Sequence, residues 1–349
     1  MGSLLLHWIY PSRRRESIDS WLNFSPWQTC LQTHKKVNHS TTAIAHPNVA
    51  LIKYWGKSDR AENIPSTPSI SITLSKLETK TTITEADIDT IWINHKRVND
   101  EKILRFLSQI REKTAIAAIK INTENNFPTG AGLASSASGF AALTTALNRH
   151  FSLGFTQNEL SAIARKGSAS SARSIFGGIV SLQGPSWEAA IVEQNNSWPL
   201  RVIIAKTSSE RKKVGSSQGM ELTRRTSPYY EPWIREAKTD FDDCLLAIKE
   251  QDFEKLAELS ERSCLKMIGT MLSTSPPLIY WNPTTLECIQ AIRKMRDAGT
   301  AVFFTTDAGP QIKAICTPES AKEVTKSLSS IVGPTNIFGC EIGGNARIV

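Results

Sequence analysis

The segment PTGAGLASSAS (residues 128–138) carries two glycines followed by a run of small residues. Gly130 and Gly132 let the backbone turn tightly and approach a ligand closely, and the small residues then lead directly into a predicted helix. The N–H groups and the dipole at such a helix N-terminus form an anion site suited to a phosphate chain. The Lys-Ser/Thr ending of a Walker A loop is missing. The alternative is a Gly/Ser turn that merely precedes an ordinary helix.

Upstream, the segment AHPNVALIKYWGK (residues 45–57) predicts a strand that ends in charged and phenolic side chains. Lys53, Tyr54 and Lys57 would then lie at one end of a sheet, where their polar groups can meet an anionic ligand. The alternative is that both lysines are solvated strand-end residues, which is the usual position of lysine.

Two later segments place polar groups at element ends. In ARKGSASSARSIFGG (residues 164–178), Ser168, Ser170 and their neighbours offer hydroxyl donors, and Arg173 can hold a carboxylate in a two-pronged grip. In FFTTDAGP (residues 303–310), Asp307 follows an apolar strand and precedes a Gly-Pro turn, a place where catalytic groups often project. The alternatives are an exposed arginine on a polar helix start and an ordinary turn aspartate.

Apolar periodicity predicts a mixed α+β protein. Strands are expected over residues 41–54, 69–83, 90–94, 115–122, 189–205 (with a loop at 195–198), 301–306, 311–316 and 337–342. Helices are expected over residues 133–151, 232–250, 253–271, 283–298 and 318–331. A further helix is expected to begin after a capping box formed by Thr156 and Glu159. Because the regular βαβα alternation of a Rossmann sheet is absent, we predict two α+β domains (39–190 and 191–349). Residues 1–38 show neither a helical nor a strand period, and we predict a poorly ordered extension there.

Composition and charge exclude several classes of protein. The 349 residues carry 41 Lys and Arg against 33 Asp and Glu, a net charge of +8, and residues 1–36 supply +3 of it. The other basic residues show no zinc-finger, RNP or basic-zipper pattern, so we expect no nucleic-acid partner. No apolar run reaches the roughly 18 residues that span a bilayer, so we expect no membrane partner. Six cysteines without a Cys-x-x-Cys pair indicate reduced thiols, no metal site and a cytoplasmic protein.

Taken together, the segments resemble a known family. The glycine-rich segment is similar to the ATP-binding motif of the GHMP kinase superfamily, and the Lys-Tyr-Trp-Gly-Lys ending at residue 57 resembles its mevalonate diphosphate decarboxylase branch. The segments around Arg173 and Asp307, together with RKKVGSSQGM (residues 211–220), resemble the same branch in the same order. The resemblance runs from about residue 41 to the C-terminus. It implies a GHMP-kinase-like fold of an ATP-binding N-terminal domain and a C-terminal domain, with the active site in the cleft between them.

The resemblance also implies a role for each site residue. Asp307 matches the family's catalytic aspartate, Lys53 would pair with it, and Arg173 would hold the substrate carboxylate. Positions near the substrate are matched by Tyr54, Lys57, Ser168, Ser170 and Ser216. The ATP phosphates would lie against Pro128, Gly130, Ala131, Gly132, Leu133, Ala134, Ser135, Ser136 and Ala137. Further implications are ATP and Mg²⁺ as cofactors and a homodimeric enzyme that decarboxylates mevalonate 5-diphosphate to isopentenyl diphosphate by way of 3-hydroxyl phosphorylation.

Three alternatives stay open at the level of sequence. Thr67-Pro68-Ser69 replaces the Asn-Ser-Ser of many family members, which leaves mevalonate 5-phosphate as a possible substrate, giving isopentenyl phosphate. Mevalonate 3-kinases share the fold but stop after phosphorylation, and they resemble decarboxylases that have lost the lysine and aspartate matched by Lys53 and Asp307. A binding protein on a GHMP scaffold is the non-enzymatic alternative, since a fold alone does not imply a function.

Overall fold

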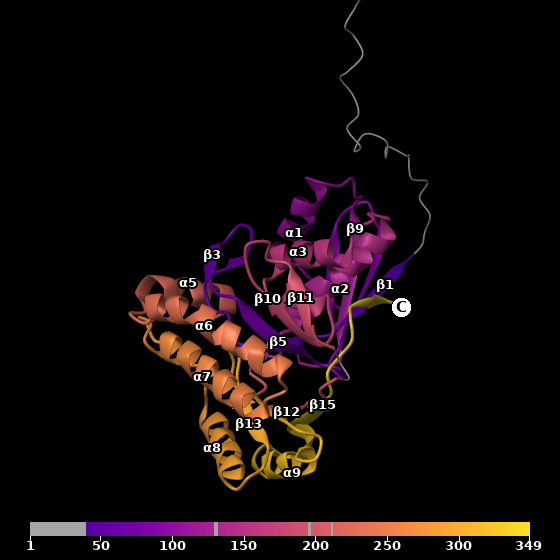
Figure 1. Ribbon diagram of the computed structural model, residues 1–349. Helices are drawn as coiled ribbons and strands as arrows, with labels where there is room; N and C mark the ends of the chain where they lie inside the picture. The colour runs from indigo at the N-terminus through magenta and orange to yellow at the C-terminus, as the bar shows by residue number, and fades with distance from the viewer. Residues whose placement is uncertain (1–39, 129–131, 195–196, 211) are drawn as a thin grey trace, which may run out of the picture. The chain divides into compact units, whose positions relative to one another are not determined.

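The structure of the protein is a computed structural model that describes residues 40–128, 132–194, 197–210 and 212–349 (Figure 1). These described residues form one compact unit. The extension predicted at residues 1–38 lies outside the described residues, as do Gly130 and Ala131 of the glycine-rich segment. Helices and strands alternate irregularly along this unit, and the strands form several sheets, which confirms the α+β prediction.

The first half of the unit builds two sheets and a short hairpin. The larger sheet has the order β16-β1-β6-β9-β7-β8, formed by β1 (Thr41–Ala45), β6 (Thr79–Glu85), β7 (Thr90–Ile93), β8 (Lys96–Val98), β9 (Ile119–Asn125) and, from the C-terminus, β16 (Arg347–Ile348). The smaller sheet has the order β11-β10-β5-β2, formed by β2 (Asn48–Ile52), β5 (Ser69–Thr73), β10 (Ile179–Leu182) and β11 (Ala189–Glu193). The hairpin consists of β3 (Lys57–Asp59) and β4 (Ile64–Pro65).

Four helices accompany these sheets. They are α1 (Glu101–Arg111), α2 (Ser135–His150), α3 (Gln157–Gly167) and the single turn α4 (Ser171–Ser174). Helix α2 packs on β1 and β6 and contacts α3 and α4. The predicted capping box starts α3, because the Thr156 hydroxyl accepts from the Glu159 N–H and the Glu159 carboxylate accepts from the Thr156 N–H. The packing of α2 against α3 and α4 holds the start of α2 close to the serine-rich turn that joins α3 to α4.

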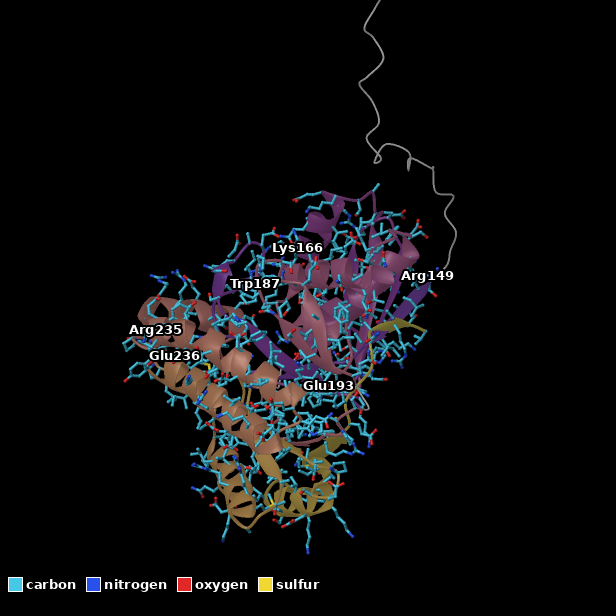
Figure 2. All side chains as sticks on the ribbon, in the orientation of Figure 1. Arg149, Lys166, Trp187, Glu193, Arg235 and Glu236 are labelled. Carbon is cyan, nitrogen blue, oxygen red and sulfur yellow. The ribbon has the colours of Figure 1, made fainter. Side chains whose placement is uncertain are left out.

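The second half contributes one sheet and most of the long helices. The sheet has the order β13-β14-β12-β15, formed by β12 (Arg201–Ala205), β13 (Val302–Thr305), β14 (Ile312–Cys316) and β15 (Ile337–Cys340). The helices are α5 (Ser216–Thr226), α6 (Tyr230–Lys249), α7 (Phe253–Leu272), α8 (Pro283–Asp297), α9 (Ala321–Val332) and the 3₁₀ turn Pro334–Asn336. Helices α6 and α7 lie side by side, and α7 contacts both β2 and β13 (Figure 1). Arg235 and Glu236 on α6 extend into solvent (Figure 2).

One hydrophobic cluster joins the two halves. It combines Leu51 and Ile72 of the smaller first-half sheet with Phe241 of α6, Leu259 of α7 and Phe303 of β13, all fully buried. Burial of this apolar surface stabilises both halves at once. The division into two domains at residue 190 stays a prediction. No helix among the described residues is long and apolar enough to cross a membrane.

Several predicted element boundaries are wrong. The strand predicted over residues 41–54 is two strands, β1 and β2, which belong to different sheets on either side of Pro47. Proline has no N–H to donate to a sheet, so the strand is interrupted there. The strand predicted over residues 69–83 likewise divides into β5 and β6. The helix predicted from residue 133 begins at Ser135, because Ala134 has a left-handed φ of 55°.

Candidate active site

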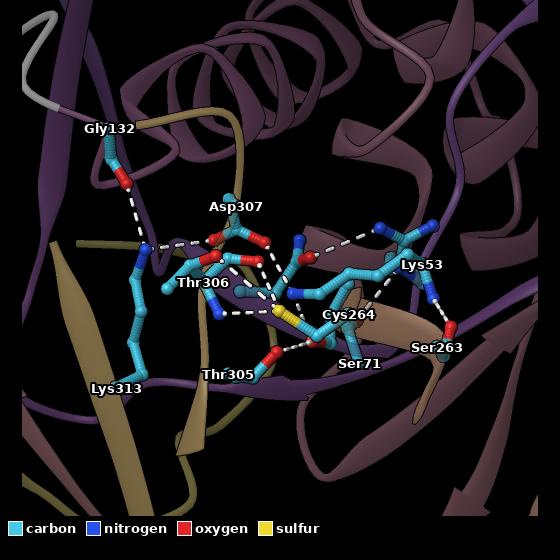
Figure 3. A network of polar contacts seen from close by, with 12 residues as sticks. Lys53, Ser71, Gly132, Ser263, Cys264, Thr305, Thr306, Asp307 and Lys313 are labelled. Carbon is cyan, nitrogen blue, oxygen red and sulfur yellow. Dashed lines mark hydrogen bonds and ion pairs between the residues drawn. The ribbon is translucent and has the colours of Figure 1, made fainter. Parts of the chain in front are cut away.

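A carboxylate held between two buried lysines lies at the junction of the two halves (Figure 3). Asp307 follows β13, Lys53 follows β2, and Lys313 belongs to β14. The Lys53 ammonium donates to Oδ1 of Asp307 at 2.9 Å, and the Nζ of Lys313 lies 3.1 Å from Oδ2. Both lysine side chains are almost fully buried, whereas Asp307 keeps about a quarter of its side chain exposed, at 27%. The structure thus brings together Lys53 and Asp307, the pair that the family resemblance implied, and adds Lys313.

The lysines fix the charge of this carboxylate. Burial alone opposes ionisation of Asp307, but the charges and hydrogen bonds of Lys313 and Lys53 outweigh it and hold the pKa of the carboxyl well below its usual range. Burial lowers the pKa of Lys313, although the Asp307 charge opposes that shift. Asp307 is therefore an acceptor of hydrogen bonds at neutral pH, with one oxygen on each ammonium group.

Arg173 lies fully buried in α4, beside the smaller first-half sheet. Its Nε donates to the Ser71 hydroxyl at 2.8 Å, one Nη donates to the Ser69 hydroxyl at 2.6 Å, and the other reaches Oδ1 of Asn48 at 3.4 Å. Burial lowers the pKa of the guanidinium to about 10, so the group keeps its charge at neutral pH. Among the described residues its hydrogen-bond partners are all neutral, which suits a cation that receives an anionic ligand.

Tyr54 and Lys57 follow Lys53 along the chain. Tyr54 is partly buried, and burial raises the pKa of its phenol to about 12, so the hydroxyl is neutral and able to donate. The Lys57 ammonium donates to the Asn63 amide oxygen and, at 3.3 Å, to the Ser217 hydroxyl of α5. Burial, helped by the positive charges of Lys102, Arg60 and Arg105, lowers the pKa of Lys57 to about 8. This end of the site therefore collects positive charge.

The start of α2 is the place where the sequence motifs predicted the ATP phosphates to bind. Among the residues that the structure describes, no side chain caps the first turn of α2. Ala134 turns the chain in a left-handed conformation, and Gly132 has a φ of +85°. The Ser136 hydroxyl lies 3.5 Å from that of Ser168, which lies 3.2 Å from the Ser170 hydroxyl. Of the other predicted nucleotide contacts, Pro128 and Ser135 flank this turn, while Leu133 and Ala137 are buried. A helix N-terminus surrounded by hydroxyls is suited to binding phosphate oxygens.

A second lysine that the sequence motifs did not single out lies just before α5. The Lys212 ammonium donates to the Ser216 hydroxyl at 2.8 Å and to the Ala308 carbonyl at 3.0 Å. Burial lowers its pKa to about 8; the Asp307 charge opposes this shift, and Lys313 and Lys102 add to it. Lys212 thereby links Ser216 to the backbone of the turn that follows Asp307. A signal for Lys313 existed in the sequence, because it is a charged residue inside an otherwise apolar strand, Ile312–Cys316.

Among the described residues, no group of three His, Cys, Asp or Glu side chains could hold a metal ion. Asp307 is already occupied by two ammonium groups. The oxygen donors available near the α2 N-terminus are the hydroxyls of Ser136, Ser168 and Ser170. This donor set fits Mg²⁺ only as an ion that arrives on phosphate groups and keeps several waters, which is its usual mode of binding.

Comparison with known proteins identifies the family. Residues 45–190 match the family described as diphosphomevalonate decarboxylase-like N-terminal domain, and residues 202–345 match the mevalonate 5-diphosphate decarboxylase C-terminal domain. The chain is 35% identical to the diphosphomevalonate decarboxylase of Schizosaccharomyces pombe, over 85% of this chain and 83% of the relative. It is also 35% identical to the enzyme of that name from Saccharomyces cerevisiae, over 78% of this chain and 76% of the relative.

Solved structures agree with these matches. Mevalonate diphosphate decarboxylase from Staphylococcus aureus superposes with a TM-score of 0.84 at 34% identity, covering 89% of this chain and 98% of the other. A structure described as MDDEF in complex with MVAPP, AMPPCP and magnesium gives a TM-score of 0.84 at 33% identity, with the same coverage. These neighbours have the GHMP-kinase-like fold that the sequence motifs implied. The chain therefore belongs to the diphosphomevalonate decarboxylase family.

Proposed function

We propose that this chain catalyses the ATP-dependent decarboxylation of mevalonate 5-diphosphate, giving isopentenyl diphosphate, ADP, phosphate and CO₂. The observation that carries the proposal is the Asp307 carboxylate, which Lys53 holds at 2.9 Å beside the start of α2 and the fully buried Arg173. The named activity of the relatives supports the same reaction, as does the neighbour whose description names MVAPP, AMPPCP and magnesium.

The reaction divides into two steps. In the first, the 3-hydroxyl oxygen attacks the γ-phosphorus of ATP, ADP leaves, and Asp307 orients the hydroxyl and accepts its proton. In the second, the new C–O bond to phosphate breaks and releases inorganic phosphate. The bond between the carboxylate carbon and C2 then breaks, CO₂ leaves, and that electron pair forms the C2–C3 double bond of isopentenyl diphosphate.

The other residues position the two ligands. Arg173 holds the substrate carboxylate so that the breaking C–C bond aligns with the cationic centre at C3. Lys57, with Lys102 nearby, supplies positive charge for the diphosphate, and the Tyr54, Ser168, Ser170 and Ser216 hydroxyls donate to substrate oxygens. ATP binds with its phosphates at the α2 N-terminus, and Mg²⁺ accompanies it to offset the phosphate charge. The hydroxyls of Ser136, Ser168 and Ser170 are the oxygen ligands that we assign to that ion.

Features of the chain favour this reaction over the alternatives. Lys53 and Asp307 are both present and in contact, which disfavours a kinase that stops after phosphorylation. The cations around Lys57 favour a diphosphate over a monophosphate, because each additional phosphate charge gains attraction there. We further infer an active site between an N-terminal domain (39–190) and a C-terminal domain (191–349), a homodimer, and a cytoplasmic location.

The proposal is tested by measuring ADP and CO₂ release from purified protein with ATP and Mg²⁺. Mevalonate, mevalonate 5-phosphate and mevalonate 5-diphosphate are offered in parallel. Equal amounts of ADP and CO₂ with the diphosphate alone are expected. The same products from the monophosphate would reassign the substrate, ADP without CO₂ would make the protein a kinase, and no turnover of any compound would refute the proposal.

The substitution Asp307→Asn tests the base directly. It keeps the shape of the side chain but removes the proton acceptor, so the release of ADP and of CO₂ should both fall by about 10³-fold or more. The binding of ATP, measured by calorimetry, should persist. Retention of more than about a tenth of either activity would show that Asp307 does not take part in the chemistry.

A further inference from the structure

Lys313 is a second buried lysine beside Asp307, and charge balance alone does not account for its presence. It is the charged residue of β14, with only 1% of its surface exposed. Burying an ammonium group is costly unless it is paired. One carboxylate, however, needs only one counter-ion, and Lys53 already lies 2.9 Å from Asp307. Two buried lysines on one aspartate leave this place with a net positive charge, so the second lysine requires a separate reason.

The second partner of Lys313 suggests that reason. Its ammonium also donates to the backbone carbonyl of Gly132 at 3.1 Å, immediately before the start of α2 (Figure 3). The backbones of the two segments also approach each other closely, because a Cβ added to Gly132 would lie only 3.2 Å from the Cα of Gly309, two residues after Asp307. The hydrogen bond of Lys313 therefore connects two segments that already lie side by side, the end of the glycine-rich segment and the turn that carries the carboxylate.

We propose that Lys313 is a positioning residue that joins the nucleotide-binding segment to Asp307, so that the bound nucleotide and the proton acceptor are held in register. The inference rests on the proposed function, because it assigns the start of α2 to ATP and Asp307 to the 3-hydroxyl. The ammonium group donates to both sides at once. Its removal should both weaken nucleotide binding and raise the pKa of Asp307, whereas removal of a lysine that merely neutralises the carboxylate would raise that pKa without weakening nucleotide binding.

The effect on Asp307 has a defined sign. The charged groups that face it are Lys53 after β2, Lys313 on β14, Lys212 before α5 and Arg173 on α4, and the Cys264 thiol of α7 lies near Lys313. Removing the Lys313 charge takes away one of the two cations in contact and raises the pKa of Asp307. Because the base must be ionised, the acidic limb of the pH dependence of kcat then moves to higher pH.

The experiment compares Lys313→Met with the wild-type protein in the full-length chain. Calorimetry with ATP and Mg²⁺ should show a Kd about tenfold higher, while the Kd of mevalonate 5-diphosphate changes less than twofold. The acidic limb of kcat should move upward by about one pH unit or more. Lys313→Gln also removes the charge and should move the limb by a similar amount, which keeps the test available if the methionine variant fails to fold.

Lys266→Met is a matched control. Lys266 and Arg262 together hold the buried carboxylate of Asp240, at 2.9 Å each, so this variant also takes one of two cations from a buried aspartate. It should lower thermal stability without altering the ATP Kd or the acidic limb. An ATP Kd within twofold of wild type in the Lys313 variants would overturn the inference, whether or not the acidic limb moves. If the wild-type protein binds ATP but turns over none of the three substrates, the proposed function fails, while the Kd comparison still tests Lys313.

Discussion

At the residue scale, Arg173 illustrates how the site prepares for an anion. The guanidinium is fully buried, and Ser69, Ser71 and Asn48 fix its orientation through side-chain oxygens. Each of its three nitrogen atoms donates to a neutral partner, and in the part of the chain that the structure describes no carboxylate forms an ion pair with it. Desolvation of an uncompensated charge is unfavourable in the free protein, and a bound carboxylate removes that cost. Arg173 is therefore expected to contribute to substrate binding more than to the stability of the free protein.

The substitution Arg173→Lys tests this expectation. A lysine keeps the charge but loses the planar fork, so it cannot hold the carboxylate and the serine hydroxyls together. We expect kcat/KM for mevalonate 5-diphosphate to fall about 10- to 100-fold, from the loss of charged hydrogen bonds, with the ATP Kd unchanged. Arg111→Lys is the control: Arg111 makes a two-pronged pair with Asp89, at 2.6 and 2.8 Å, and its loss should not change kcat/KM. Equal losses in both variants would contradict the assignment.

The sequence anticipated the residues whose motifs are local and missed those defined by the fold. Lys53 and Asp307 are 254 positions apart, and only the family resemblance predicted that they pair. Lys212 and Lys313 were missed, although Lys212 lies in the segment 211–220 and Lys313 interrupts an apolar strand, because neither signal shows what the lysine contacts. A lysine is usually exposed, and the burial of Lys313 arises from pairing between β14 and its neighbours, which a linear pattern does not encode.

At the element scale, the nucleotide end depends on how α2 begins. Gly132 has a φ of +85°, and the chain passes so close to Gly309 that a side chain would have to displace one of the two segments. Ala134 then adopts a left-handed conformation before the helix begins at Ser135. No described side chain caps the first turn of α2, and uncapped N–H groups at a helix start are suited to binding phosphate oxygens.

The substitution Gly132→Ala should disturb this start specifically. The strained φ and the 3.2 Å approach to Gly309 would shift the segment, so the KM for ATP should rise about tenfold or more, while α2 itself remains folded. Gly139→Ala is the matched control, because Gly139 lies within α2 and a Cβ there meets no atom within 4 Å. That variant should keep the KM for ATP and gain roughly 0.5–1 kcal/mol in the free energy of unfolding. A KM for ATP unchanged in Gly132→Ala would refute the proposed nucleotide position.

Most long elements could be predicted because their apolar period is regular, as in α6, α7 and α8. Helix α1 was not predicted, although Asp100 accepts from the N–H groups of Lys102 and Ile103 and is a recognisable N-cap. Helix α5 was not predicted either, because Gly215 provides no side-chain cap and the helix is polar, so that neither a cap nor an apolar period marks it. The breaks within the predicted strands at residues 41–54 and 69–83 follow from assignment to different sheets, a tertiary property that period alone does not show.

At the scale of the whole described unit, the hydrophobic core that joins the two halves also brings charged residues of both halves together. One hydrophobic cluster spans both halves, and α7 contacts β2 as well as β13. Lys53 and Lys57 come from the first half, whereas Lys212, Asp307 and Lys313 come from the second. The packed core holds these cations close together in spite of their repulsion. The free protein therefore tolerates a concentration of positive charge that an anionic ligand relieves.

This arrangement predicts proton uptake on binding. Burial and neighbouring cations lower the pKa of Lys57 and of Lys212 to about 8, so both lose charge as the pH rises through that value. An anionic ligand favours the charged form and raises both values again. We expect the Kd of mevalonate 5-diphosphate to be nearly constant below pH 7 and to rise several-fold between pH 8 and 9.5. Binding near pH 8.5 should take up protons, as measured by calorimetry in buffers of different ionisation enthalpy.

The free energy of unfolding of the free protein should rise with pH over part of this range, whereas the affinity for the diphosphate falls. Both lysines have lower pKa values in the folded than in the unfolded protein. Between about pH 8 and pH 10.5 the unfolded chain therefore binds more protons, and these two groups make the free energy of unfolding increase with pH.

Two variants test the cause of the pH dependence of the Kd. Lys57→Arg, which stays charged, should flatten this dependence, whereas Lys238→Arg on the exposed face of α6 should leave it unchanged. If the Kd showed no dependence on pH between 7 and 9.5, the positive charge at this end of the site would not be what attracts the diphosphate.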